Sequence, residues 1–440
     1  MHGYSKKAIA IIVAIIIIAV IILSLLVALP IALNEKKAII ILPGLIASGL
    51  LDEITGQAIW APFDTDYVLG DFFNPDVSTQ MVLSLALQAM NGGKESILSK
   101  IVNKSDDSII KKLHLDEDGN PIYKHIVPAT MAYEGNQKYG ALQAYRDIYE
   151  DMEARYGSEF DVIVFNYDWR VDNRLSAEKL EMFINENKYD KVIIASHSMG
   201  NLVATNYFAR SQENRDKVLG HISLAAPYYG SMMALTVLET LDNLIFDILG
   251  ALPDFVRNSL EDVAEDQFLP LAANLTTAYQ LLPTIELIST PQVDTSFLNV
   301  DGAPITTREA LIEFYKSRDW AKRKDGNLKK VVLELEEYWD SFYVESNGNK
   351  VHASTLINTL YCAGNDYRTE NVVNMVNGTM STVETSYQGD GTVQLFSALL
   401  GNDIDYKNAA VIENCDHFGC GNKFDDVLES RVFEFIDAIK

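Results

Sequence analysis

The sequence predicts an α/β fold, with a mostly parallel sheet covered by helices on both faces. Short apolar runs bounded by turn residues recur along the chain and alternate with amphipathic stretches, which is typical of buried strands joined by helices. In addition, the β-branched run at residues 191–195 leads through small residues directly into a helical stretch. With 440 residues, 48% of them hydrophobic, the chain is long and apolar enough for a large buried core.

The individual elements follow from these patterns. The apolar runs predict strands at residues 38–42, 162–166, 192–195, 221–225, 356–362 and 409–412. The amphipathic stretches predict helices at residues 142–156, 177–187, 202–210 and 424–439. The interval 231–351 has no obvious strand pair but has helical stretches at 307–316 and 328–342, so we interpret it as a helical cap inserted into the sheet domain.

An uncharged run precedes the predicted sheet. Residues 8–33 lack charged side chains, and 26 residues at about 1.5 Å each can span a hydrocarbon core of about 30 Å. The run is longer than the roughly 7–15 apolar residues of a cleaved signal peptide, so we expect a transmembrane signal anchor, with cleavage after its Ala-x-Leu ending as the alternative. Lys6 and Lys7 place residues 1–7 in the cytoplasm, and the domain at 34–440 is then extracytoplasmic on a single-pass membrane protein.

Charge and cysteine content exclude several classes of partner. A formal net charge of −25 argues against nucleic acid, whose phosphates are bound by an excess of Lys and Arg. The chain has three cysteines, with no CxxC pair and no Cys/His cluster at zinc spacing. We therefore predict neither a metal nor a cofactor.

The most specific motif is KVIIASHSMGN at residues 191–201. It places Ser198 between a strand and a helix, with small residues two positions before and after it, Ser196 and Gly200, as a strained nucleophile elbow requires. His197 lies inside the turn and is not expected to be the base. The alternative is an ordinary strand-turn-helix unit with a buried serine.

A serine nucleophile needs a histidine base and an acid that orients it, in the chain order Ser, acid, His for this type of turn. We predict His417 as the base, because it follows a predicted strand in a short loop before the last helix, whereas His352 would lie at a strand's far end. Asp390 and Asp366 compete as the acid. We favour Asp390, because the glycine-flanked loop GDGTV can hold a carboxylate rigidly against the imidazole.

Acyl transfer also needs two backbone N–H donors for the developing oxyanion. Met199, directly after the candidate nucleophile, supplies the first. The second is expected from Leu45, because the strand at 38–42 runs into Pro43-Gly44, a turn that can bring the chain toward the elbow.

Several motifs, in order along the chain, resemble the lecithin:cholesterol acyltransferase family, which includes a lysosomal phospholipase and phospholipid:diacylglycerol acyltransferases. The matching segments are IIILPGL at 39–45, YDWR at 167–170, SHSMGN at 196–201, AAPYYGS at 225–231, YQLLP at 279–283 and GDGTV at 389–393. The resemblance covers most of 38–440. It implies an α/β-hydrolase core with a cap that acts on lipid esters through an acyl-enzyme.

Carried over by position, the resemblance implies Ser198 as the nucleophile, Asp390 as the acid and His417 as the base. It also implies Leu45 and Met199 as oxyanion donors, in agreement with the reading from the residues. Mammalian members have a disulfide-closed lid near their first conserved Trp, whereas this chain has no cysteine before Cys362. Contact of Trp60 with the acyl chain is therefore a hypothesis, and a packed tryptophan is the alternative.

Two further features leave choices open or point to the scaffold. Asp168 and Arg170 in YDWR are expected to form a buried structural ion pair. Cys415 and Cys420 flank His417 and predict either a small disulfide loop or two free thiols.

Together these features predict a membrane-anchored serine acyl hydrolase or O-acyltransferase. Its substrate is expected to be a lipid ester at a membrane, a phospholipid or an acylglycerol, and its acyl acceptor is water or an alcohol. An esterase or thioesterase on a soluble substrate, or a non-catalytic binding protein of the same fold, are the alternatives.

Overall fold

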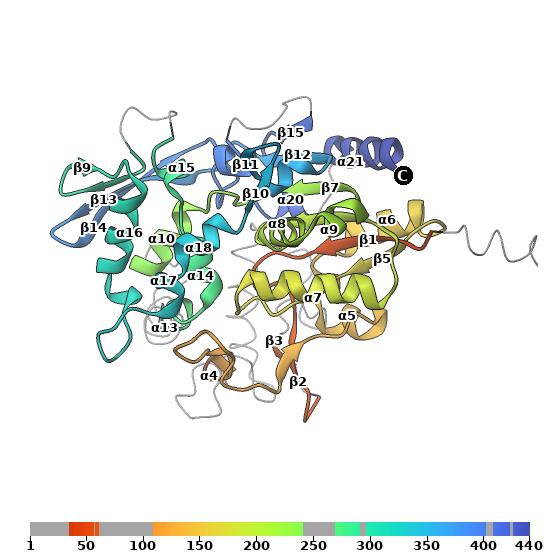
Figure 1. Cartoon of the computed structure of the whole chain (residues 1–440), viewed down its shortest axis with the longest axis horizontal. Coiled ribbons are helices and arrows are strands. Elements are labelled where there is room, and N and C mark those ends of the chain that lie inside the picture. Colours follow the sequence, from red (N-terminus) through yellow and green to blue (C-terminus); the bar gives the residue numbers. More distant parts are fainter. Residues whose placement is uncertain are drawn as a thin grey trace, which may run out of the picture.

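The computed structural model describes residues 35–56, 58–60, 109–240, 269–290, 296–401, 408–422 and 426–440 (Figure 1). The predicted cytoplasmic segment at 1–7 and the anchor at 8–33 lie outside these ranges. Within them, no helix has both the length and the apolar character needed to cross a membrane.

The central sheet has six strands. They are β1 (Lys37–Leu42), β5 (Asp161–Val164), β6 (Lys191–His197), β7 (Val218–Leu224), β12 (Thr359–Gly364) and β15 (Ala409–Ile412). In space their order is β15-β12-β7-β6-β1-β5, and each neighbouring pair is parallel. The mostly parallel sheet predicted from the sequence is confirmed, and the carboxyl ends of its strands share one edge.

Helices cover both faces of this sheet. The alternating side chains of β1 enter two separate apolar clusters, with Ile40 in one and Ile39 and Ile41 in the other. The first cluster contains Leu180 of α7 (Asn173–Glu186) and residues of α8 (Gly200–Arg210). The second contains Ile148 of α6 (Arg146–Tyr156) and residues of α21 (Asp426–Ile439). Burial on both faces explains why the strands read as continuous apolar runs.

The starts of α6, α7, β7 and β12 differ from the predicted residues by three or four positions, and β7 begins at Val218 instead of residue 221. Helix α6 begins at Arg146, after a short 3₁₀ turn at η2 (Ala141–Gln143). Helix α7 begins before the predicted residue 177, because the Asp172 side chain accepts a hydrogen bond from the Arg174 amide and caps the helix there. Strand β12 begins at Thr359, because η5 (Ala353–Leu356) is also a 3₁₀ turn.

The interval 231–351 contains strands as well as helices. Its described helices are α10 (Met232–Glu239), α13 (Leu269–Ala272), α14 (Thr276–Gln280), α15 (Ile285–Ile288), α16 (Arg308–Ser317), α17 (Lys330–Leu333) and α18 (Leu335–Asp340). It also contains β8 (Leu298–Val300), β9 (Ala303–Pro304), β10 (Tyr343–Ser346) and β11 (Asn349–His352). The β10–β11 hairpin turns at Asn347 and Gly348, both with positive φ, a pattern typical of tight hairpins.

A second sheet joins this interval to the chain that follows β12. Strands β13 (Thr369–Val376) and β14 (Thr379–Ser386) form a hairpin, and β13 also pairs in parallel with β8, giving the order β14-β13-β8-β9. Figure 1 shows these strands on the same side of the molecule as α10 and α16. The second sheet therefore combines residues of the predicted cap, 231–351, with residues from after β12.

The remaining described elements pack around these two sheets. They are β2 (Leu50–Asp52), β3 (Ala58–Trp60), β4 (Ile126–Pro128), α4 (Ile109–Leu113), α5 (Tyr133–Tyr139), α9 (Gln212–Lys217), η4 (Asp319–Ala321), α19 (Leu395–Ala398) and α20 (Gly419–Asn422). Strands β3, β2 and β4 form a small sheet of their own.

Candidate active site

Three polar side chains predicted from the sequence meet at the carboxyl edge of the central sheet. Ser198 follows β6, His417 follows β15, and Asp390 lies between β14 and β15. His417 Nε2 is 2.8 Å from Ser198 Oγ, and His417 Nδ1 is 2.8 Å from Asp390 Oδ2. The order serine, imidazole, carboxylate is the arrangement that lets an imidazole take a proton from a serine hydroxyl.

Ser198 occupies a strained turn. Its φ is +52°, in the left-handed region that residues other than glycine rarely adopt, and its amide donates to Leu224 O at 2.9 Å. A Cβ at Gly200 would lie 2.5 Å from Leu42 O, so the helix after the serine can approach β1 only with glycine there. The geometry matches a nucleophile elbow.

A network of buried polar groups stabilises this turn, and the sequence analysis did not predict its hydrogen bonds. Ser196 Oγ lies 2.6 Å from both Asn201 Oδ1 and His221 Nε2. The Asn201 amide donates to three backbone carbonyls, those of Ser196, Ser198 and Leu224. Serine in place of the usual glycine before the nucleophile thus has a bonding role. No sequence signal marks His221, because its contact with the elbow comes from a different strand.

Asp390 is held rigidly. Its side chain is 1% exposed. Oδ1 accepts hydrogen bonds from the amides of Thr392 (3.0 Å) and Val393 (2.7 Å), while the His417 amide donates to its backbone carbonyl at 2.8 Å. Oδ2 is therefore directed at the imidazole, in the way expected from the GDGTV loop.

The competing acid lies elsewhere. Asp366 is exposed, and its carboxyl group interacts with Glu413, raising the pKa of Glu413. The structure therefore brings Asp390, and not Asp366, to His417.

The loop after β1 lies against the serine. A Cβ added at Gly44 would be 3.0 Å from Ser198 Cβ, so Leu45 follows a residue in direct contact with the elbow. Among the described residues, the backbone amides of Leu45 and Met199 donate to no hydrogen-bond acceptor. Both amides are available for the oxyanion role predicted for them.

The other candidate histidines have different surroundings. The ring nitrogens of His197 bond to Tyr145 and to the backbone carbonyl of His417. His352 is 4% exposed and packs among aromatic rings, with no hydrogen-bond partner for either ring nitrogen in the described part of the chain. Neither histidine contacts Ser198 with a ring nitrogen.

Trp60 and Trp169 are buried next to the loop after β1. Trp60 is 7% exposed, its indole N–H donates to Ile46 O at 2.7 Å, and its ring packs on Trp169 with centroids 5.5 Å apart. Next to Trp169, Arg170 and Asp168 form the expected buried ion pair, with Nε to Oδ1 at 2.9 Å and Nη2 to Oδ2 at 2.8 Å.

Cys415 and Cys420 are free thiols on either side of His417, with Sγ atoms 3.1 Å apart. A disulfide bond is about 2.05 Å long, so the structure shows the free-thiol alternative. The hydrogen bond with Cys415, followed by burial, raises the pKa of the Cys420 thiol. Over the described ranges, no group of three His, Cys, Asp or Glu side chains is arranged to hold a metal ion.

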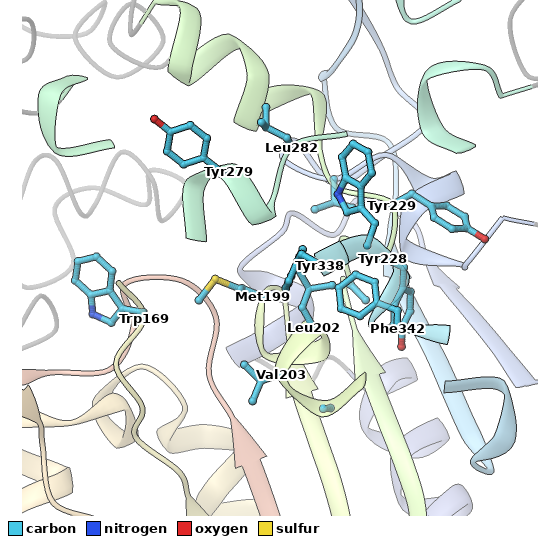
Figure 2. Close-up of a cluster of buried hydrophobic side chains, with 14 of the residues drawn as sticks. Trp169, Met199, Leu202, Val203, Tyr228, Tyr229, Tyr279, Leu282, Tyr338 and Phe342 are labelled. Atoms are coloured by element: carbon cyan, nitrogen blue, oxygen red, sulfur yellow. The ribbon is translucent and has the colours of Figure 1, made fainter. Parts of the chain in front are cut away.

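An apolar cluster connects the elbow to the cap. Figure 2 shows side chains of the elbow and α8 beside aromatic residues of the cap and of the loop after β7. All of these belong to one buried cluster: Met199, Leu202, Val203, Tyr228, Tyr229, Tyr338 and Phe342. Residues of the interval 231–351 and of the central sheet domain thus share one core, to which Met199 belongs.

Comparison with known proteins gives one family match. Residues 136–400 match the family model described as lecithin:cholesterol acyltransferase. No sequence among the curated proteins matches this chain.

Two of the matching solved structures differ in how well they fit this chain. A chain from the crystal structure of the Tle4-Tli4 complex has a TM-score of 0.51 and 14% identity, covering 92% of this chain and 99% of that chain. The mature form of the Bacillus licheniformis lipase BlEst2 has a TM-score of 0.28 and 14% identity, covering 68% of this chain and 86% of that chain. The first likeness supports the overall fold and nothing finer.

Proposed function

This chain belongs to the lecithin:cholesterol acyltransferase family, and from that premise we propose that it is a serine acyl hydrolase or O-acyltransferase of membrane lipid esters. We further propose that Ser198 is its nucleophile, His417 its base and Asp390 the acid that orients His417. The observation that carries this proposal is the continuous contact from Ser198 Oγ through the imidazole to the Asp390 carboxylate, with both distances 2.8 Å.

In the proposed acylation step, Ser198 Oγ attacks the ester carbonyl carbon while His417 Nε2 takes the serine proton. Charge on the carbonyl oxygen is stabilised by the amides of Leu45 and Met199. The tetrahedral intermediate then collapses, the ester C–O bond breaks, and the leaving alcohol takes the proton from His417. Asp390 keeps Nδ1 protonated throughout, so that Nε2 is free to accept.

In the second step the acyl-enzyme is resolved by an acceptor hydroxyl. His417 removes the acceptor's proton as its oxygen attacks the acyl carbon, and returns a proton to Ser198 Oγ as the acyl–serine bond breaks. Water as the acceptor gives a free fatty acid, whereas an alcohol gives a new ester. The choice depends on which acceptor the site positions above the acyl-enzyme.

We propose that residues 8–33 anchor the enzyme in the membrane and present residues 34–440 on the extracytoplasmic side. The tether would keep the local lipid concentration high, which matters because a chain of net charge −25 is repelled by anionic lipid at range. The test is extraction of the expressed full chain from membranes with alkaline carbonate, compared with a variant that lacks residues 1–33. Release of both proteins to the same extent would refute anchoring.

The function is tested with the full chain and neutral phosphatidylcholine vesicles, with and without a long-chain alcohol or diacylglycerol, and with products separated by mass. Ser198→Ala is expected to lower turnover at least about 10³-fold with an unchanged unfolding temperature. Activity that survives in Ser198→Ala would exclude Ser198 as the nucleophile.

The products distinguish the remaining possibilities. Free fatty acid that is unaffected by added alcohol identifies a phospholipase or lipase. Transfer of the acyl group to the alcohol, with less free acid, identifies an acyltransferase. Cleavage of a short soluble ester without action on vesicles would favour a soluble-ester esterase instead.

A further inference from the structure

We infer that Tyr145 and His197 are positioning residues, which form a hydrogen-bonded relay between two loops. One is the oxyanion loop, which follows β1 and carries Gly44 and Leu45, and the other is the His417 loop, which follows β15. The relay fixes these loops relative to each other. The inference rests on the proposed function, because it assigns these residues a role in the chemistry of Ser198 and His417. Neither residue touches the reacting atoms in this role.

The relay is a continuous set of three contacts. The Gly44 amide is 2.9 Å from Tyr145 Oη, Tyr145 Oη is 2.7 Å from His197 Nδ1, and His197 Nε2 is 2.8 Å from the backbone oxygen of His417. These residues come from four different places in the chain: the loop after β1, the residue before α6, the end of β6, and the loop after β15.

The donors and acceptors can have only one order. A carbonyl oxygen only accepts, so His197 Nε2 carries a proton and donates to His417. Burial, with a smaller effect from His417, lowers the pKa of His197 to about 3, so the ring is neutral and Nδ1 must accept. Tyr145 therefore donates to Nδ1, and burial raises its pKa, so its hydroxyl keeps the proton. Its oxygen in turn accepts from Gly44.

Packing leaves the His197 ring little freedom. A Cβ added at Gly44 would lie 3.2 Å from His197 Nδ1, and a Cβ added at Gly421 of α20 would overlap the ring itself. The ring thus lies between the oxyanion loop and the helix that follows His417. Its only two polar atoms are both used in the relay, and the residue is 4% exposed.

The relay joins the parts that must keep a fixed geometry during acyl transfer. Leu45, a proposed oxyanion donor, follows Gly44 directly, and His417 is the proposed base. A misplacement of about 1 Å between such groups can lower a rate about 10²-fold. The relay sets the distance between the Leu45 amide and the His417 ring without a covalent link.

The test uses the full chain and three single variants. Tyr145→Phe removes the hydroxyl. His197→Asn keeps an acceptor near the Nδ1 position, but its side chain is too short to reach the His417 carbonyl. The longer side chain of His197→Gln can bring an amide N–H to that carbonyl. The matched control is Tyr156→Phe, which removes another buried tyrosine hydroxyl. Tyr156 is the last residue of α6, the helix that Tyr145 precedes, and its hydroxyl contacts Phe433 O and Asp437.

The first readouts are kcat and KM on phosphatidylcholine vesicles and the rate at which a fluorophosphonate labels Ser198. We expect Tyr145→Phe and His197→Asn to lower kcat and the labelling rate about 10-fold, with KM changed less than twofold. His197→Gln is expected to recover most of the rate. The double variant Tyr145→Phe/His197→Asn should be no slower than the slower single variant, because both changes break one unit.

Several results would overturn the relay. They are wild-type labelling rates in Tyr145→Phe and His197→Asn, an equal loss in Tyr156→Phe, a His197→Gln variant as slow as His197→Asn, or effects that multiply in the double variant. If Tyr145 and His197 only stabilised the fold, they would act independently of the His417 carbonyl. Tyr156→Phe would then lose as much activity, His197→Gln would be as slow as His197→Asn, and the effects would multiply in the double variant.

Hydrogen–deuterium exchange tests the relay without substrate. Peptides covering residues 43–47 and 413–419 are expected to exchange at least about fivefold faster in Tyr145→Phe and His197→Asn than in the wild type or Tyr156→Phe. Unchanged exchange in both loops would refute the relay even if Ser198 proved to be the nucleophile. Conversely, faster exchange in a protein whose Ser198→Ala variant keeps its activity would support the relay and refute only the proposed function.

Discussion

Individual residues at this site divide into those that would react and those that hold them in place. Asp390 belongs to the second group, because its Oδ1 is already bound by two backbone amides and only Oδ2 faces the imidazole. Removal of its charge therefore changes the state of His417 without removing the loop's own hydrogen bonds.

Asp390→Asn is expected to lower kcat about 10³- to 10⁴-fold, because an amide N–H facing Nδ1 favours the wrong imidazole tautomer. Asp366→Asn, at an exposed carboxylate with no contact to His417, should change kcat less than twofold. Steady-state kinetics on the same vesicles compares the two. If Asp366→Asn were the slower variant, the acid would have to be reassigned to Asp366.

The buried pair of Asp168 and Arg170 makes a prediction about stability. Arg170→Met leaves the Asp168 carboxylate buried without its cation, with only the backbone amide of residue 170 still donating to Oδ1, and should lower the free energy of unfolding by about 3–5 kcal/mol. Arg155→Met, which breaks an exposed ion pair with Asp437, should lower the free energy of unfolding far less. Urea unfolding measures the free energy of unfolding of both variants. Equal decreases in the two would show that the buried pair stabilises the fold no more than the exposed pair does.

Site residues could be predicted from the sequence where their role depends on neighbouring positions in the chain. Ser198 and Gly200 could be found because the elbow imposes its residue pattern on neighbouring positions. Tyr145, Asn201 and His221 could not be found in this way, because their hydrogen bonds depend on how separate strands and loops are placed in space.

Among the secondary-structure elements, the strands of the central sheet were predictable and the second sheet was not. The central strands are apolar on both faces, so each gives a continuous signal. Strand β13 mixes buried and partly exposed residues, and its pairing with β8 joins Val373 to Leu298 across a long stretch of chain. A sequence of mixed polarity with a distant partner carries little local evidence of a strand.

The loop that follows β15 carries its own testable property. Because Cys415 and Cys420 hold their sulfurs 3.1 Å apart, a mild thiol oxidant such as diamide should join them, with a mass loss of about 2 Da. Cys362, buried in β12, should stay reduced.

If the oxidised loop fixes His417 more firmly, dithiothreitol should then lower turnover, and Cys420→Ser should remove the response to both reagents. An unchanged rate after complete bridging, verified by mass, would show that the bridge does not position the base.

For the whole molecule, buried histidines make stability depend on pH. Burial lowers the pKa of His197, His221 and His352 to about 3 in each case. In the unfolded chain these rings gain protons below about pH 6.5, whereas in the folded protein they stay neutral to about pH 3. Folding stability is therefore fully present above pH 6.5 and is lost as pH falls toward 3.

His352 offers the cleanest test, because it lies among the rings of Tyr228, Phe342 and Tyr343 and contacts no reacting group. At pH 5 its contribution to the loss is about 2 kcal/mol. His352→Phe should therefore lose about that much less unfolding free energy than the wild type between pH 7.5 and pH 5, as measured by urea unfolding. The same pH dependence in both proteins would show that His352 is protonated when folded.

The parallel pairing of β8 with β13 limits how this enzyme can be redesigned. Strand β13 pairs with β8 and leads through its hairpin into β14, which ends at Ser386, four residues before Asp390. The second sheet is therefore joined directly to the loop that holds Asp390. A chimaera that takes only residues 231–351 from a relative would leave the edge of β13 facing a foreign strand. Grafts that aim to change substrate preference should therefore transplant residues 296–304 and 369–386 together.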